Sequence, residues 1–338
     1  MTTASPRMPR AESATPQLAL APGAMEEVVR GVRRMFRNLP STTAEAVCLI
    51  RAYEHAKPAA TRIVDDPYAH WFLGPMLRAA LSYEGVVPNL GPYAAWATDG
   101  IVGFVAARHR YIDDALRRAT RRMRQVVLLG AGYDMRAYRF APELRRCTVF
   151  EVDHPATGGR KARILARRQK QLPDVNVVRV QVDFEKQSFR RELEKAGFES
   201  RQLTFFVWEG VSMYLSRTGV KATLETIHAM SAPGSELVMD LWYLPDEPDL
   251  VSSARRWSSS LLSLLGEPVT FSLHPEDAEP FLQRLGFRLR ELADAKSLRR
   301  RYFDARTHLY PTNYLVRAVV DGRPSAPRRP ARRTRRRT

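Results

Sequence analysis

Two glycines and one carboxylate are the first residues in this chain whose types and spacing could form a binding site. The segment 126–134 (VVLLGAGYD) is typical of an apolar strand that enters a glycine turn, and 149–153 (VFEVD) of a second strand that ends in Asp153. If the two strands are parallel neighbours, Gly130 and Gly132 let a ligand approach the backbone while the carboxylate accepts from two ribose hydroxyls. The spacing therefore predicts a nucleoside site.

The residues that follow the second glycine indicate which nucleoside this site would take. A dinucleotide fold needs a third glycine so that a helix N-terminus can approach a pyrophosphate. This chain has Met135 at that position, and we expect a side chain of that size to crowd the path of the pyrophosphate. Asp134 suits a ligand with a cationic amino group better than an anionic one. S-adenosylmethionine has no phosphate and needs only the turn and the ribose acid. We therefore expect S-adenosylmethionine as the cofactor, and an NAD(P)-dependent oxidoreductase is the alternative.

Polar side chains also follow the third and fourth predicted strands. Asp183 and Phe184 could bind adenine, with the carboxylate accepting from the exocyclic amine and the ring packing on the base, although a loop aspartate that begins a turn is an equally good interpretation. Glu209 follows the apolar run 204–208 (TFFVW). A carboxylate in that position is difficult to explain as core and is typical of a functional site.

The sequence favours oxygen as the methyl acceptor. No Asn- or Asp-Pro-Pro-aromatic turn, which is typical of nitrogen methylation, follows the fourth strand, and Cys147, a potential nucleophile for carbon methylation, precedes the second strand. A carboxylate acceptor is already ionised at neutral pH, whereas a phenol would benefit from a base. His154 precedes a proline and fits a turn better than a base. Tyr214 could orient the acceptor, but a core tyrosine explains it equally well. We expect O-methylation of a carboxylate or hydroxyl of a small molecule.

Strands and helices alternate after about residue 120, as in a doubly wound α/β fold. Apolar runs such as 205–207 (FFV) are typical of strands that are buried on both faces. We predict a mostly parallel, Rossmann-like sheet of seven strands, at 125–129, 148–152, 176–182, 204–208, 236–241, 287–292 and 310–320. Helices are expected after Asp134 and at 160–171, 189–196 and 217–230. Arg317 in an apolar strand indicates an edge strand or an antiparallel closing strand.

The remaining segments are predicted to extend this cofactor-binding domain, which spans 121–320. Residues 1–24 are expected to be disordered, 25–120 to be helical, and 321–338 to form a disordered tail. Residues 242–280 interrupt the alternation and are predicted to form a cap. We expect the N-terminal helices and this cap to define the acceptor pocket, because both lie outside the alternation and because the cap holds aromatic residues, namely Trp242, Tyr243 and Trp257.

Charge and composition restrict the partners and the compartment. The 338 residues carry a formal net charge of +18, of which 321–338 contribute +7 through eight Arg and one Asp. Such a tail should bind polyanions in a salt-dependent way, and it supports an RNA- or protein-directed methyltransferase as a further alternative. No segment approaches the roughly 20 apolar residues of a membrane helix. Cys48 and Cys147 are predicted to be buried thiols, and the histidines lack metal-ligand spacing, so we expect a cytoplasmic protein without a metal.

Three motifs together resemble the leucine carboxyl methyltransferase family: 129–139 (LGAGYDMRAYR), 150–155 (FEVDHP) and 209–215 (EGVSMYL). The likeness is to the bacterial branch that is described as S-adenosylmethionine-dependent methyltransferases. It extends from about residue 42 to 320 and includes 66–69 (DPYA). Met135 stands where the family usually has Thr.

The resemblance implies a role for individual residues. Arg108 matches the arginine that holds the methionine carboxylate in the family, and Arg51 occupies the place of a basic residue with the same task. Without the family, both would be interpreted as solvated helix residues. The resemblance also places Glu209 near the methyl group. It implies that Gly130 and Gly132 line the methionine portion and that Asp153 binds the ribose. The adenine would contact Asp183 and Phe184.

Overall fold

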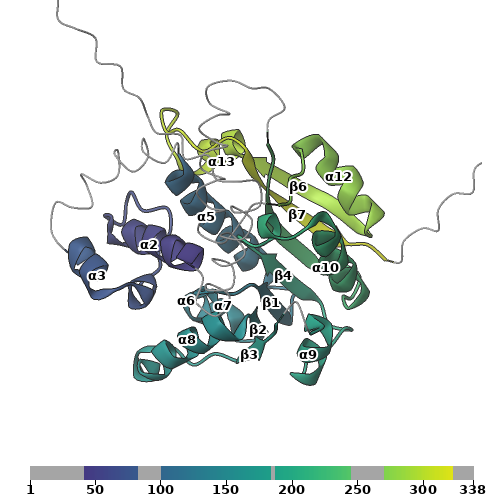
Figure 1. Cartoon of the computed structure of the whole chain (residues 1–338), viewed down its shortest axis with the longest axis horizontal. Coiled ribbons are helices and arrows are strands. Elements are labelled where there is room, and N and C mark those ends of the chain that lie inside the picture. The colour runs from purple at the N-terminus through teal and green to yellow at the C-terminus, as the bar shows by residue number, and fades with distance from the viewer. Residues whose placement is uncertain (1–41, 83–99, 184–186, 245–269, 323–338) are drawn as a thin grey trace, which may run out of the picture.

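The computed structural model describes residues 42–82, 100–183, 187–244 and 270–322, whose arrangement is shown in Figure 1. The predictions for residues 1–24, for Phe184, for most of the cap and for nearly all of the basic tail therefore lie outside the described residues. Within the four ranges, no helix is long and apolar enough to cross a membrane.

In the described part of the chain, seven strands form one sheet in the order β3-β2-β1-β4-β5-β7-β6. They are β1 (Gln125–Leu129), β2 (Thr148–Asp153), β3 (Val177–Gln181), β4 (Thr204–Trp208), β5 (Glu236–Trp242), β6 (Phe287–Asp294) and β7 (Asn313–Val320). β1 to β5 run parallel, whereas β7 pairs antiparallel with both β5 and β6. The predicted doubly wound, mostly parallel sheet is confirmed.

Helices cover both faces of this sheet (Figure 1). The first face carries α2 (Thr42–Ala56), η1 (Ala69–Phe72), α3 (Pro75–Ser82), α5 (Ile101–Ala119), α6 (Arg136–Arg139), α7 (Ala141–Leu144), α8 (Pro155–Ala166) and α13 (Ala295–Tyr302). The second face carries α9 (Phe189–Lys195), α10 (Arg217–Ala229) and α12 (Pro275–Arg284). Two short 3-10 helices, η2 (Gln169–Gln171) and η3 (Ser212–Tyr214), lie in the connections.

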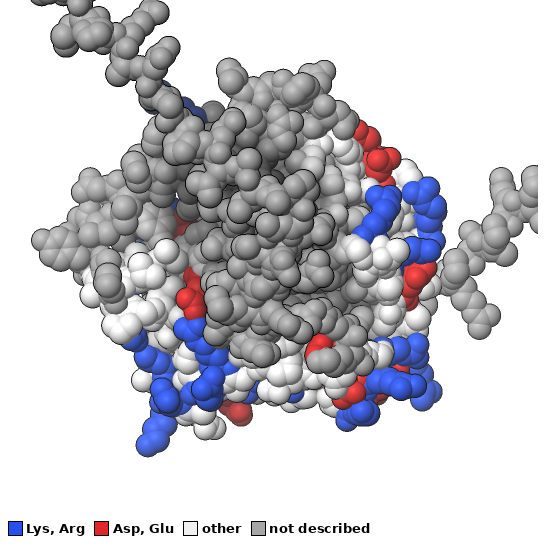
Figure 2. Space-filling model, viewed as in Figure 1, with Lys and Arg blue, Asp and Glu red and all other residues white. Residues whose placement is uncertain are grey.

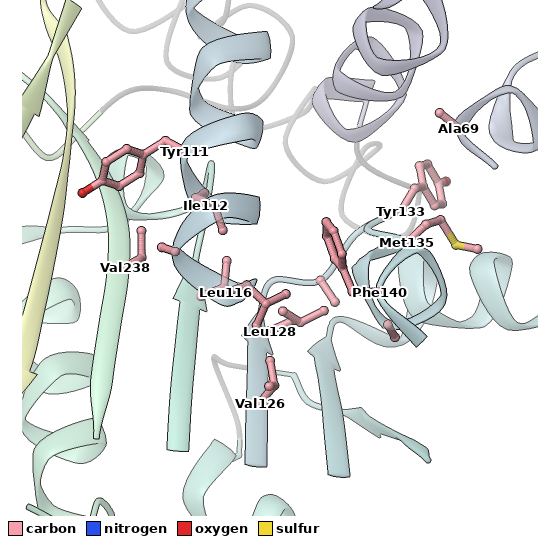
Figure 3. Close-up of a cluster of buried hydrophobic side chains, with 14 of the residues drawn as sticks. Ala69, Tyr111, Ile112, Leu116, Val126, Leu128, Tyr133, Met135, Phe140 and Val238 are labelled. Atoms are coloured by element: carbon pink, nitrogen blue, oxygen red, sulfur yellow. The ribbon is translucent and has the colours of Figure 1, made fainter. Parts of the chain in front are cut away.

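The core has two layers because successive strand residues point to opposite faces. Val126 and Leu128 of β1 belong to the cluster on the first face, whereas the intervening Val127 and the following Leu129 belong to the cluster on the second face. Figure 3 shows part of the first cluster, in which Leu116 of α5 lies against the sheet beside Leu128. Burial on both faces explains why these strands are apolar throughout.

The structure differs from the predicted elements at α8, which spans Pro155–Ala166 instead of 160–171, and in the region after β5. β7 lies between β5 and β6, so it closes the sheet in the antiparallel sense but is not an edge strand. Its Arg317 remains half-buried because Glu236 and Glu291 pair with it at 3.5 and 3.7 Å. Trp242, which we assigned to the cap, is the last residue of β5, and its indole donates to the Phe271 carbonyl at 2.8 Å. α12 overlaps the end of the predicted cap, and α13 was not predicted.

The described surface is basic even without the tail. Figure 2 shows Lys and Arg side chains along the lower rim of the molecule, where Figure 1 places α8 and α9. Arg163 and Arg167, at the end of α8, and Lys195, at the end of α9, are all exposed. The face beyond the carboxyl ends of the strands carries a different set of charges, which are buried.

Candidate functional site

The site is built where the strand order reverses. β1 and β4 are parallel neighbours at this point, and an open α/β sheet binds ligands in the crevice beyond the carboxyl ends of such a pair. Leu129 ends β1 in register with Trp208, which ends β4. Gly130 and Glu209 therefore leave the sheet side by side.

The glycine turn after β1 requires its glycines. Gly130 has φ of +67°, and a Cβ at this position would lie 2.4 Å from Cγ2 of Val211. Gly132 has φ of +48°, which also favours glycine. The N–H groups of Gly130 and Ala131 donate to the Val152 carbonyl at 2.9 and 3.1 Å, so the turn is attached to the end of β2. The turn thus presents bare backbone directly beside Asp153.

Asp153 is held in place by two backbone donors. Its Oδ2 accepts from the Gly132 N–H at 2.8 Å, and its Oδ1 accepts from the His154 N–H at 2.7 Å. Burial raises the pKa of Asp153, and these two hydrogen bonds oppose the increase. Each carboxylate oxygen keeps a second lone pair, as a grip on two ribose hydroxyls requires. His154 has a turn role, since its Nδ1 accepts from the Ala156 N–H at 3.2 Å at the start of α8.

A small pocket opens beside Asp153, and it is lined by the glycine turn, α8 and the end of β3. Its walls include Ala131, Gly132, Gly158, Lys161 and Gln181. The Val182 N–H donates to the Asp153 carbonyl at 2.9 Å, so the chain that leads from β3 to Asp183 is attached to the end of β2. The pocket thus combines a carboxylate, two glycines without side chains and the end of a strand. Phe184, the other predicted adenine contact, lies outside the described residues.

Glu209 and Arg108 contact each other. Nε of Arg108 donates to Oε1 of Glu209 at 2.8 Å, and its Nη1 donates to Asp240 Oδ2 at 2.7 Å. Asp240 lies within β5, is fully buried, and also accepts from the Gly210 N–H at 2.7 Å. Burial lowers the pKa of Arg108, but Asp240 and Glu209 outweigh burial and raise it. The two residues that the family resemblance assigns to different parts of the cofactor therefore form one buried pair here.

Arg136 pairs with three carboxylates of the site, one of which is Glu209. Its side chain is 1% exposed, and it donates to Asp113 at 2.7 Å, to Asp134 at 2.5 Å and to Glu209 at 2.7 Å. Burial alone would raise the pKa of Glu209, but contacts with His109, Arg136 and Arg108 hold it well below its ordinary value. Burial also opposes the lowered pKa of Asp134, for which Arg136 is the main cause.

His109 lies between Arg136 and Glu209 without adding a charge of its own. Its Nδ1 is 2.7 Å from Nη2 of Arg136 and 2.8 Å from Oε1 of Glu209. Burial lowers the pKa of His109 to about 4, although Glu209 acts in the opposite direction. The imidazole is therefore neutral at pH 7, and the positive charge that stabilises Glu209 at this pH comes from the two arginines.

Arg51 reaches the glycine turn from α2. Its Nη2 donates to the Tyr133 carbonyl and to Sγ of Cys48, both at 2.8 Å, and its Nη1 pairs with Asp66 at 3.2 Å. Nε of Arg51 is buried and has no hydrogen-bond partner among the residues that the structure describes. The structure thus brings the N-terminal helical part onto the turn, at the place where the family resemblance expects a basic residue.

Together these residues form what we call the charge cluster, which consists of four arginines and five carboxylates: Arg51, Arg108, Arg136, Arg139, Asp66, Asp113, Asp134, Glu209 and Asp240. With His109 neutral, its net charge is −1. S-adenosylmethionine carries an ammonium, a sulfonium and a carboxylate, so its net charge is +1. The cluster therefore complements this cofactor better than it complements an anionic pyrophosphate.

Several residues of the cluster were not predicted as site residues. Asp240 could have been found, because a carboxylate inside the apolar strand 236–241 needs a buried partner. Arg136 and Asp113 gave no such signal, since an arginine-rich helical sequence usually lies on a solvated face. Tyr214, in η3, is half-buried and lies five residues after Glu209, and its role stays a prediction.

Met135 does not lie where its sequence position indicated. Its side chain is fully buried in the hydrophobic cluster of the first face (Figure 3). The prediction that this side chain crowds the path of a pyrophosphate is therefore wrong, because the side chain lies in the core. The departure from the family's usual Thr changes the core beneath the turn.

Comparisons with known proteins agree with this geometry. The family model described as "Leucine carboxyl methyltransferase" matches residues 44–228. A protein of Mycobacterium avium (strain 104) is 27% identical over 271 residues, which are 73% of this chain and 82% of the relative. A protein of Streptomyces coelicolor is 32% identical over 232 residues, which are 66% of this chain and 74% of the relative. Both names begin "Putative S-adenosyl-L-methionine-dependent methyltransferase".

A solved structure supports the fold alone. The DUF574 family protein of Streptomyces avermitilis MA-4680 superposes with a TM-score of 0.51 at 13% identity, covering 79% of this chain and 99% of that one. The family match spans more than half of this chain, and it does not support the NAD(P)-dependent alternative. The chain therefore belongs to the leucine carboxyl methyltransferase family of S-adenosylmethionine-dependent methyltransferases.

Proposed function

We propose that this protein transfers a methyl group from S-adenosylmethionine to an oxygen atom of a small molecule, with a carboxylate as the favoured acceptor and a hydroxyl as the alternative. One observation carries the proposal: every carboxylate of the charge cluster is paired with an arginine. The family description, which names a carboxyl group, points in the same direction.

Arginine pairing makes two of these carboxylates poor bases, whereas at Asp240 burial outweighs Arg108 and raises the pKa. The pKa values of Asp134 and Glu209 are lowered, despite burial, by the arginines around them, and burial lowers the pKa of His109 to about 4. Removing a proton from a phenol, whose ordinary pKa is about 10, calls for a stronger base than any of these. A carboxylate acceptor is already ionised at neutral pH and needs only to be placed in line. The described part of the site therefore suits a carboxylate.

The residues of this chain would bind and orient the reactants. S-adenosylmethionine supplies the electrophilic methyl group when it is bound. Asp153 would hold the ribose, and Glu209 would lie near the methyl group, where its negative charge favours a cationic ligand. Tyr214 would orient the acceptor. The remaining predicted cofactor contacts are Arg51 and Arg108 for the methionine carboxylate, Gly130, Gly132 and Asp134 for the methionine portion, and Asp183 with Phe184 for adenine.

We further propose that the N-terminal helices and the segment predicted as a cap, residues 242–280, shape the acceptor pocket. Arg51 supports this for the N-terminal helices, because it connects α2 directly to the glycine turn. Thr270 supports it for the cap, because its N–H donates to the carbonyl of Met213, a residue of η3, at 2.8 Å. Exchanging the cap for that of a relative should change acceptor preference. An unchanged preference would contradict this assignment.

The acceptor class can be tested with deuterated-methyl S-adenosylmethionine. The protein is incubated with a small-molecule extract, and labelled products are identified by mass spectrometry. Mild alkali then separates the classes, because a methyl ester releases labelled methanol whereas an aryl or alkyl ether does not. We expect alkali-labile label, and label in stable N-methyl products would refute O-methylation.

The basic tail provides the control for a macromolecular acceptor. Removing residues 323–338, which include all eight arginines of the tail, should leave turnover on a small molecule unchanged. If the true acceptor is RNA or an acidic protein, the truncation should instead weaken the substrate interaction and remove its salt dependence. Labelled macromolecules without labelled small molecules would favour that alternative.

A further inference from the structure

Lys161 is a buried cation outside the charge cluster. It lies on α8, its side chain is 1% exposed, and Arg163 on the next half-turn is exposed. Its Nζ donates to the backbone carbonyl of Asp134 and lies 2.8 Å from Oε1 of Glu151 on β2. A fully buried lysine is costly unless its ammonium is well paired, so these contacts must offset the loss of hydration.

A simple explanation is that Lys161 only neutralises Glu151, which is 4% exposed in the interior of β2. Two observations go beyond this explanation. Arg179 already lies 3.4 Å from the other oxygen of Glu151, so a second cation is present. Lys161 also reaches past Glu151 to the glycine turn, and it lines the same pocket as Asp153 and Gly132.

We propose that Lys161 is a positioning residue for the cofactor, because it fixes the end of the glycine turn against the ribose acid through the Asp134 carbonyl. The Gly132 N–H also donates to Asp153 at 2.8 Å, so these two bonds hold the second half of the turn to β2 and α8. They add to the bonds already described, from Gly130 and Ala131 to the Val152 carbonyl and from Arg51 to the Tyr133 carbonyl. The inference rests on the proposed function only for the identity of the cofactor.

Together with Arg51, which donates to the Tyr133 carbonyl, the bonds to Asp153 and Lys161 fix the backbone from Gly132 to Asp134, which is the part that we expect a ligand to approach. Within the turn, the Asp134 N–H donates to the Ala131 carbonyl at 2.8 Å, so the peptide planes on both sides of Asp134 are held. Losing the bond from Lys161 leaves the Asp134 carbonyl without the donor that orients the peptide between Asp134 and Met135. The Asp134 carboxylate, which pairs with Arg136, would move with it. Cofactor binding should then fall even if the domain stays folded.

The test separates positioning from neutralisation with a double variant, Lys161→Met/Glu151→Leu. Replacing both members of a buried pair with apolar residues commonly preserves folding. We measure the dissociation constant of S-adenosylmethionine by calorimetry for the wild type, Lys161→Met, the double variant and the exposed control Lys170→Met. Positioning predicts a dissociation constant raised about tenfold in Lys161→Met and in the double variant, as for the loss of one charge-assisted hydrogen bond. The control should bind like the wild type.

Affinity within twofold of the wild type in the double variant would overturn the proposal, since neutralisation would then be the whole role. Lys161→Gln gives a second comparison if the apolar pair prevents folding. Its neutral amide can donate to the Asp134 carbonyl, so it must bind more tightly than Lys161→Met, and equal affinities would overturn the proposal. A wild type that fails to bind S-adenosylmethionine would refute the proposed function instead.

Discussion

Arg136→Met is expected to destabilise the protein more than any other single change in the charge cluster. The guanidinium is 1% exposed and contacts three carboxylates, those of Asp113, Asp134 and Glu209. In the variant, Asp113 would still pair with Arg139, and Glu209 would still pair with Arg108. Among the described residues, no other arginine lies within ion-pair distance of Asp134. Removing one member of a buried pair costs about 3–5 kcal/mol. The free energy of unfolding should therefore fall by about 4 kcal/mol at pH 7.5.

The pH dependence of this loss gives a second check. In the wild type, Asp134 and Glu209 have lowered pKa values, so their pairing adds stability above the unfolded-state pKa of about 4 and loses it as the pH falls through the folded values. In Arg136→Met these pKa values should rise. The deficit relative to the wild type is then largest at pH 7 and shrinks below about pH 5.

Urea unfolding followed by circular dichroism measures both effects, with Arg300→Met on the exposed side of α13 as the matched control. The control should unfold within about 0.5 kcal/mol of the wild type. If Arg136→Met loses less than about 1 kcal/mol, or loses as much at about pH 4 as at pH 7.5, then Arg136 does not connect the acids in the way we describe.

Two further predictions concern the same edge of the sheet. Gly130→Ala should lower the melting temperature and weaken cofactor binding, because the new methyl group would lie 2.4 Å from Cγ2 of Val211 and because the residue has a φ of +67°. Adding Val211→Ala should restore part of the stability. If it restores none, the steric explanation is contradicted. His109 should stay neutral down to a pH of about 4, since burial lowers its pKa. Long-range proton–nitrogen spectra recorded across a pH titration measure the protonation state of its ring directly. A midpoint near 6.5, the ordinary value for histidine, would contradict this prediction.

The parallel sheet was predictable because each buried strand is a short apolar run between turn signals. All five parallel strands agree with their predicted ranges to within one residue at either end, and β1 and β4 match them at both ends. The region after β5 was harder to predict. β6 alternates apolar and charged residues, as an edge strand with one open face does, and α13 is a strongly polar helix with one buried leucine, Leu298. Such segments carry little hydrophobic signal.

The positions of the strand-end residues were predictable, but their partners were not. Topology alone brings Gly130, Asp153 and Glu209 to one edge, since parallel strands end together. The pairing of Arg108 with Asp240 depends on how α5 lies across β5, which no local pattern encodes. Arg136 and Lys161 were missed for the same physical reason: a cation that is buried by tertiary packing looks like a solvated one in the sequence.

The ribose contact of Asp153 is the central claim, and calorimetry with S-adenosylmethionine tests it most directly. We predict that Asp153→Ala weakens binding by at least tenfold while the exposed control Asp174→Asn binds like the wild type, because a charged acceptor for two hydroxyls is worth about 1.5–3 kcal/mol per bond. Thermal unfolding shows whether the variant is folded. Unchanged affinity in a folded Asp153→Ala protein would contradict the account.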